Sequence, residues 1–77
     1  MSYEKFGKYI KEKRESLQPK VAQNAFALEN EFEPAILCRI ENCKQDTKLN
    51  VLAKIAKGFN LKASQLLEEF ENSEYFD

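Results

Sequence analysis

The sequence contains no histidine, and its 77 residues include only two cysteines, two glycines and two prolines. Without histidine the chain cannot assemble a Cys–His zinc site or a Cys–His nucleophilic pair. The commonest general base near neutral pH is missing as well. The two cysteines, Cys38 and Cys43, lie five positions apart and are expected to be reduced thiols. We therefore expect no metal site, no cofactor and no enzymatic activity.

Long apolar runs and strand patterns are also lacking. No apolar stretch approaches the roughly 18 residues of a membrane span, and the N-terminal segment lacks the apolar stretch of a signal peptide. No segment alternates apolar and polar residues between turn signals, as a half-buried strand would. The sequence predicts a cytoplasmic protein without strands and without membrane contact.

What the chain does have is enough apolar sequence for one core. Hydrophobic residues make up 43% and charged residues 32%, a balance typical of a globular domain rather than a disordered chain. The net charge of −1 hides an uneven distribution. Residues 1–67 hold twelve Lys and Arg against eight Asp and Glu, whereas residues 68–77 hold five acidic residues and no basic one. The body is basic and the C-terminal end is acidic.

Five segments carry apolar residues at helical spacing. Their apolar residues are Phe6, Ile10 and Leu17; Val21, Ala25, Phe26 and Leu28; Leu37 and Ile40; Leu49, Leu52, Ile55, Ala56 and Phe59; and Leu66, Leu67 and Phe70. The predicted helices span residues 3–17, 21–29, 34–42, 48–59 and 63–70. We expect residues 1–71 to form one compact all-α domain of five helices, and residues 72–77 to form an acidic tail that is frayed in a monomer.

Turn and cap signals separate these segments. Pro19 removes an amide hydrogen and disfavours helix at the residue before it, so the first helix ends before it. Pro34 suits the first position of a helix, and Glu33 is placed to cap that helix. Asp46 or Thr47 can cap the fourth helix. The second and third helices, about four residues apart, have helix-turn-helix spacing, although any small helical bundle can contain such a pair.

The residues that follow resemble a known family. Leu37 to Lys44, with the sequence LCRIENCK, are similar to the I-S-R-I-E-N-G-K stretch of the lambda-repressor-like, or Cro/Xre-type, helix-turn-helix family. Residues 49–61 are similar to its L-x-x-L-x-K-I-A-K motif and the apolar residue after it. Gln23, Phe26 and Ala27 match its S-Q-x-x-L-A, and residues 6–14 resemble its first helix. The resemblance covers about residues 6–67 and implies a central helix-turn-helix between Gln23 and Glu41.

The resemblance also implies roles for individual residues. The family has a buried ion pair that joins its first helix to its third, and the matching residues are Arg14 and Glu41. Such a pair would fix the orientation of the helices but add little net stability. The family's phosphate-contacting positions match Gln23, Asn24, Asn42 and Lys44. Its base-reading positions match Pro34, Ala35, Cys38 and Arg39.

Several of these positions depart from the family pattern. Among the base-reading candidates, Arg39 is the one strong hydrogen-bonding side chain, suited to guanine O6 and N7, while Ala35 could only touch a thymine methyl. Glu31 and Cys43 stand where the family commonly has glycine, which predicts altered or strained turns. Glu31 also belongs to a group of acidic residues that would repel phosphate. This group consists of Glu29, Glu31 and Glu33.

The resemblance implies a sequence-specific, repressor-like transcriptional regulator that binds double-stranded DNA. One short recognition helix buries too little for tight specific binding, which predicts a homodimer on a near-palindromic operator. Phe70, Tyr75 and Phe76 are the predicted dimer contact. The alternative is a protein-interaction module, antitoxin-like or anti-repressor, that keeps the scaffold without operator recognition. The apolar third helix and the nearby glutamates favour this second interpretation.

Overall fold

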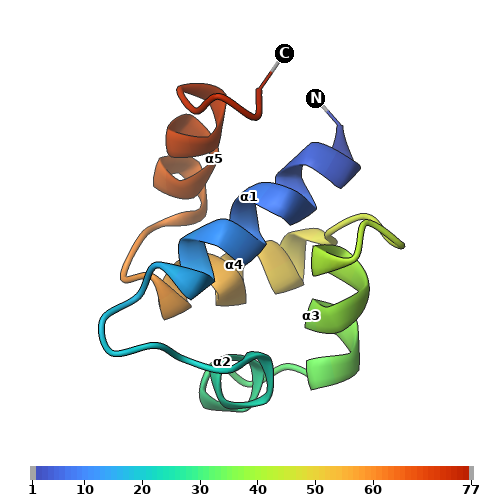
Figure 1. Ribbon diagram of the computed structural model, residues 1–77, viewed down its shortest axis with the longest axis vertical. Helices are drawn as coiled ribbons and strands as arrows, with labels where there is room; N and C mark the ends of the chain where they lie inside the picture. The colour runs from blue at the N-terminus through green and yellow to red at the C-terminus, as the bar shows by residue number, and fades with distance from the viewer. Residues whose placement is uncertain (1, 77) are drawn as a thin grey trace.

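The computed structural model describes residues 2–76, and within that range the chain forms five α-helices and no strand (Figure 1). The helices are α1 (Tyr3–Glu15), α2 (Gln23–Glu29), α3 (Pro34–Glu41), α4 (Leu49–Gly58) and α5 (Ala63–Glu71). The all-helical fold class is confirmed, and each helix end lies within two residues of its predicted position. Within the described residues, none of the helices combines the length and the apolar character needed to cross a membrane.

Two of the predicted caps differ from the structure. Pro34 occupies the start of α3 as predicted, but the Glu33 side chain makes no capping hydrogen bond to any described residue. The residue at the N-cap of α4 is Lys48, rather than Asp46 or Thr47. The Asp46 carboxylate instead accepts a hydrogen bond from the amide of Thr47 at 2.7 Å. This carboxylate therefore bonds to the amide next to it and caps no helix.

The ends of α2, α3 and α4 share one backbone motif. Glu31, Cys43 and Asn60 follow these helices with φ angles of 65°, 62° and 59°, in the left-handed region. After each, the next amide donates to the carbonyl five residues earlier, as from Phe32 to Ala27 at 3.0 Å. Glycine usually fills this position, and other residues pay a cost on the order of 1 kcal/mol there. The predicted strain at Glu31 and Cys43 is present, while the turns keep the geometry that glycine would allow.

The core lies between all five helices. Its largest fully buried side chains are Ile10, Leu37, Ile40, Ile55, Leu66 and Phe70. Ala27, Phe32 and Val51 also belong to the core, although the helical patterns had not singled out Phe32 or Val51. Phe32 lies in the turn between α2 and α3, so it enters the core from a loop rather than from a helix face.

Two residues predicted to be buried are exposed. Leu28 on α2 is 66% exposed, and Leu49 at the start of α4 is 82% exposed. The buried face of α4 is centred on Leu52, Ile55 and Ala56. At 3.6 residues per turn, Leu49 lies about a quarter turn from the centre of that face. Leu49 therefore lies beyond the edge of the buried face, and helical spacing alone wrongly predicted that it is buried.

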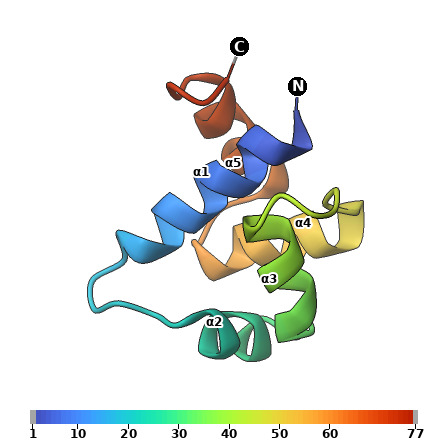
Figure 2. The ribbon, with the colours of Figure 1, turned by 45° about the vertical axis from the view of Figure 1, so that its right-hand side comes forward.

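The packing of α1 against α3 depends on a glycine. In Figure 2, α1 crosses above α2, with α3 in front at the right. A Cβ atom built on Gly7 would lie 2.1 Å from the carbonyl oxygen of Ile40 in α3. Only a residue without a side chain allows the two backbones to approach this closely. Gly7 thus sets the distance between α1 and the C-terminal half of α3.

The C-terminal segment, residues 72–76, folds back on α1 instead of fraying as predicted. Figure 1 shows the C-terminal segment, in red, on the same side of the molecule as the start of α1. The Phe76 ring meets the Phe70 ring edge-on, with centroids 5.6 Å apart, and the Tyr75 ring lies 6.2 Å from that of Tyr9. The Tyr75 hydroxyl donates to the carboxylate of Glu12. Aromatic area therefore orders this segment; Asp77 lies outside the described residues.

Candidate functional site

The two sides of α3 have opposite environments. Leu37, Ile40 and Glu41 are buried, and the remaining side of the helix faces outward. The residues predicted to read bases come together on that outer side. Ala35 and Arg39 are exposed, Pro34 and Cys38 are half-buried, and the predicted phosphate contact Asn42 is exposed at the end of the helix. The helical repeat of 3.6 residues explains this division.

The buried side of α3 is tied to α1 by the predicted ion pair, which is confirmed. Arg14 Nε lies 2.8 Å from Glu41 Oε2, and Arg14 Nη2 lies 2.9 Å from Glu41 Oε1. Arg14 is 8% exposed and Glu41 is 3% exposed. The hydrogen bonds that Arg14 donates to Glu41 raise the pKa of the Arg14 guanidinium above its ordinary value. Arg14 Nη1 also donates to the carbonyl of Val21 at 2.8 Å, which holds the segment before α2.

Gln23 is a third member of this buried group. Its Nε2 donates to Glu41 Oε1 at 2.8 Å, so one carboxylate joins α1, α2 and α3. The amide nitrogen of Gln23 is thus already engaged within the protein, and its contact with phosphate stays a prediction. Asn24, the next residue, is exposed on α2. The family motif had singled out Gln23, but nothing in the sequence indicated that its partner is Glu41.

On the outer side of α3, Arg39 is held by a residue that sequence reasoning missed. Arg39 Nε donates to Gln45 Oε1 at 2.5 Å, and the two terminal nitrogens of the guanidinium make no hydrogen bond within residues 2–76. A hollow of about 410 Å³ lies beside this pair, between α3 and the start of α4. Its lining includes Ile36, Arg39, Gln45, Asp46, Lys48 and Val51. Two cations, from Arg39 and Lys48, therefore share one surface with an apolar floor.

The turn after α3 is closed by the backbone. The amide of Lys44 donates to the carbonyl of Arg39 at 2.8 Å, and the Lys44 side chain is exposed. Asn42 Nδ2 donates to the Cys38 sulfur at 3.3 Å. Both cysteines are free thiols, as predicted, and the Cys43 thiol donates to the Glu4 carbonyl at 3.2 Å. Across residues 2–76, no cluster of three or more potential metal ligands is present.

The turn between α2 and α3 carries the predicted acidic group. Glu29, Glu31 and Glu33 are all exposed, next to the exposed Leu28. Lys54 Nζ from α4 donates to the carbonyl of Glu31 at 2.8 Å, which fixes the backbone of the turn. The acidic side chains lie at the N-terminal end of α3, whereas Arg39 and Lys44 lie toward its C-terminal end.

Comparisons with family models, with curated proteins and with solved structures gave no match. The site is therefore interpreted through its own groups. A guanidinium with two terminal nitrogens available and an exposed ammonium can pair with base edges and with phosphate oxygens. The exposed residue Ala35, on the same side of α3 as Arg39, has a small side chain, so a binding partner can approach the α3 backbone there.

Proposed function

We propose that the chain is a sequence-specific DNA-binding transcriptional regulator of the lambda-repressor-like helix-turn-helix type, repressor-like in action. It binds a near-palindromic operator as a homodimer, with α3 as the recognition helix in the major groove. The observation that carries the proposal is the placement of Arg39 on the exposed side of a helix whose other side is held by a buried ion pair.

Arg39 is the main base-reading side chain in this proposal. A guanidinium recognises guanine when two of its nitrogens donate to O6 and N7. Gln45 occupies Nε of Arg39, so Nη1 and Nη2 form the pair that meets the base. Ala35 lies one turn before Arg39 and is small enough to contact a thymine methyl group. Specificity comes from these few contacts together with DNA shape.

Phosphate contacts come from the segment after α3 and from α2. Lys44 and Lys48 are exposed on either side of the turn that leads to α4, and Asn24 is exposed near the start of α2. Cations at such positions release counterions from DNA and make binding depend on salt. The protein acts in the cytoplasm, at the nucleoid when bound. Repulsion by Glu29, Glu31 and Glu33 limits phosphate contact to the Arg39 end of α3.

Selection from a random-sequence DNA pool tests the proposal, at low and at moderate salt. The wild-type chain should enrich a motif with dyad symmetry. Arg39→Ala should lose about 1–3 kcal/mol of discrimination, roughly 5- to 150-fold, at one position of each half-site. Lys44→Ala should weaken binding to all sequences and lower the salt slope by about one unit. Lys11→Ala, an exposed lysine of α1, is the matched control and should change neither quantity.

One observation favours a second function. Leu28 is 66% exposed beside Glu29, Glu31 and Glu33, a combination of apolar and acidic groups suited to a protein partner. A protein-interaction module, antitoxin-like or anti-repressor, would keep the scaffold and use this surface. If no sequence is enriched and neither Arg39→Ala nor Lys44→Ala matters, the DNA-binding proposal is wrong and this second function replaces it.

A further inference from the structure

The two arginines of the chain are held by partners of different charge. At the surface of α3, Arg39 Nε donates to the amide oxygen of Gln45 at 2.5 Å, and the guanidinium makes no other hydrogen bond within residues 2–76. In the interior, the Arg14 guanidinium donates to both carboxylate oxygens of Glu41, from Nε at 2.8 Å and from Nη2 at 2.9 Å. A neutral amide therefore holds the exposed arginine, and a carboxylate holds the buried one.

The chemistry of the partner decides how many donors of an arginine stay available. A carboxylate can accept two neighbouring N–H groups of one guanidinium, as Glu41 does with Arg14. The amide of a glutamine has one oxygen that accepts, and its nitrogen is itself a donor. Gln45 therefore engages Arg39 at Nε, and both terminal nitrogens keep their donors. Because an amide has no net charge, the positive charge of Arg39 is not compensated by Gln45.

The backbone places Gln45 beside Arg39. Cys43 turns the chain with a φ angle of 62°, and the amide of Lys44 donates to the Arg39 carbonyl at 2.8 Å. This bond joins the residue before Gln45 to the residue that Gln45 contacts. Both side chains line the same hollow between α3 and the start of α4. The contact from Gln45 to Arg39 thus rests on a closed backbone turn.

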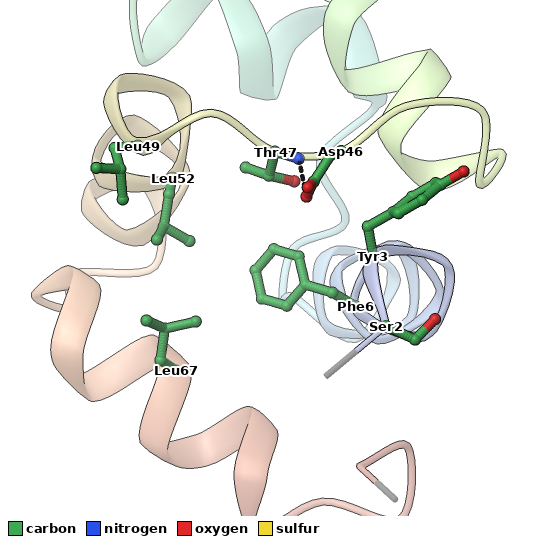
Figure 3. A pocket seen from close by; sticks show the side chains of 8 residues that line it. All are labelled: Ser2, Tyr3, Phe6, Asp46, Thr47, Leu49, Leu52 and Leu67. Carbon is green, nitrogen blue, oxygen red and sulfur yellow. Dashed lines mark hydrogen bonds between the residues drawn. The ribbon is translucent and has the colours of Figure 1, made fainter.

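The acidic residue that follows Gln45 does not take its place. Asp46 lines the same hollow, but its carboxylate accepts a hydrogen bond from the amide of Thr47 at 2.7 Å (Figure 3). Arg39 forms no ion pair with Asp46 or with any other described residue. Within residues 2–76 the neutral contact to Gln45 is therefore the one hydrogen bond that orients the Arg39 guanidinium.

We propose that Gln45 is a positioning residue for base reading, which holds Arg39 by Nε and leaves Nη1 and Nη2 to donate to one guanine. The inference rests on the proposed function, because the guanine belongs to the operator. Guanine O6 and N7 accept a pair of donors in a fixed geometry, so the pose of the guanidinium matters. An arginine that is already ordered loses less side-chain freedom on binding. Gln45 thus raises discrimination through Arg39, without contacting the base.

Nuclear relaxation of the Arg39 Nε–H group in the full chain tests the hold without DNA. The order parameter of wild type should lie above about 0.6, and that of Gln45→Met should fall below it. Methionine keeps the length of the side chain but has no amide oxygen. Gln45→Glu should keep the group ordered, because a carboxylate also accepts from Nε. Gln18→Met, at an exposed glutamine after α1, is the matched control and should behave like wild type.

The role in recognition is measured as the ratio of affinities for two duplexes that differ only at the guanine assigned to Arg39. Gln45→Met should lower this ratio about 2- to 12-fold, the effect of leaving one long side chain to be ordered on binding. Gln45→Glu should lower it at least as much although Arg39 stays ordered, because the carboxylate also takes a terminal nitrogen. In an Arg39→Ala chain neither substitution should change the ratio further.

An Arg39 Nε–H group that is equally mobile in wild type and in Gln45→Met would overturn the inference. A wild-type guanine preference in Gln45→Met or in Gln45→Glu would do the same. So would an equal loss in the Arg39→Ala background, since Gln45 would then contact the DNA itself. Failure of the proposed function looks different: no DNA sequence is enriched, and the relaxation data alone then decide whether Gln45 holds Arg39.

Discussion

Helix α1 packs against its two neighbours by different means. Toward α3 it uses the buried Arg14–Glu41 pair and the close backbone approach at Gly7. Toward α5 and the C-terminal segment it uses aromatic rings, with Phe6 and Phe70 edge-on at 5.1 Å between centroids. Around these rings, near the surface, lie tyrosine–carboxylate hydrogen bonds and the Lys13–Glu69 ion pair at 2.8 Å.

This difference shows which contact fixes the orientation of a neighbouring helix relative to α1. Aromatic rings tolerate small shifts because their attraction depends mainly on buried area, with a preference for edge-on geometry. A bidentate guanidinium–carboxylate pair in the interior tolerates few arrangements. Buried pairs often add little net stability, yet breaking one is costly. The α3 side of α1 therefore positions the candidate interface, and the α5 side chiefly supplies apolar area.

The largest expected effect follows from breaking the buried pair. Arg14→Met leaves the Glu41 carboxylate buried without its cation, which should lower the free energy of unfolding by about 3–5 kcal/mol. Urea denaturation followed by circular dichroism measures this change. Lys11→Met removes an exposed positive charge from the same helix and should stay within about 0.5 kcal/mol of wild type. An unchanged midpoint for Arg14→Met would show that the pair does not hold α3 in place.

A smaller change in stability is expected for Gly7→Ala, and its sign tests the close approach of α1 and α3. Alanine normally stabilises a helix interior relative to glycine by about 1 kcal/mol. Here the added Cβ would lie 2.1 Å from the Ile40 carbonyl oxygen, so the helices must separate, at a cost of about 1–3 kcal/mol. Gly7→Ala should therefore lower the thermal midpoint. A raised midpoint would mean that α1 and α3 are further apart than described.

The smallest effect concerns alkaline pH on the α5 side of α1. Burial, with Glu69 beside it, raises the pKa of the Tyr9 hydroxyl to about 12 from its ordinary value of 10. The fold thus favours the protonated form, and this contribution to stability is complete below pH 10 and lost as the pH rises toward 12.

Urea midpoints measured from pH 9 to 12 test this behaviour. Wild type should lose more stability over that range than Tyr9→Phe, which has no hydroxyl to ionise. Tyr3→Phe, at the other end of α1, controls for the loss of a tyrosine. If the urea midpoints of wild type and Tyr9→Phe fall in parallel as the pH rises, the Tyr9 hydroxyl does not contribute to the stability of the contact between α1 and α5.

The sequence predicted the helices and the buried pair because both depend on local or motif-level signals. Periodic apolar residues and Pro34 located the five helices, and the family resemblance located Arg14 and Glu41. The exposure of Leu28 and Leu49 could not be predicted, since both lie at apolar-stripe positions and only tertiary packing decides which edge of a helix is covered. The folded C-terminal segment was missed because its aromatic residues make contacts more than 60 positions away in the chain.

The sequence predicted which residues of α3 lie together on its exposed side, but not the hydrogen bonds that hold the site residues in place. Arg39 and its neighbours on α3 share one side as helical spacing requires, and this held. The contact from Arg39 to Gln45 depends on the left-handed turn at Cys43, a residue whose type does not favour that conformation. The bond from Gln23 to Glu41 joins residues 18 positions apart through the packing of α2 on α3. Neither contact has a spacing rule from which it could be derived.

The proposal that the exposed side of α3 reads DNA is tested most directly by mapping amide chemical shifts. The protein is titrated with the duplex selected from the random pool. Shifts should concentrate on α3 and the turn after it, from Ala35 through Arg39 to Lys44, with smaller changes near Asn24. The Arg39→Ala chain should lose most of them at equal DNA concentration. Shifts confined to α5 or the C-terminal segment, or none at all along α3, would contradict the account.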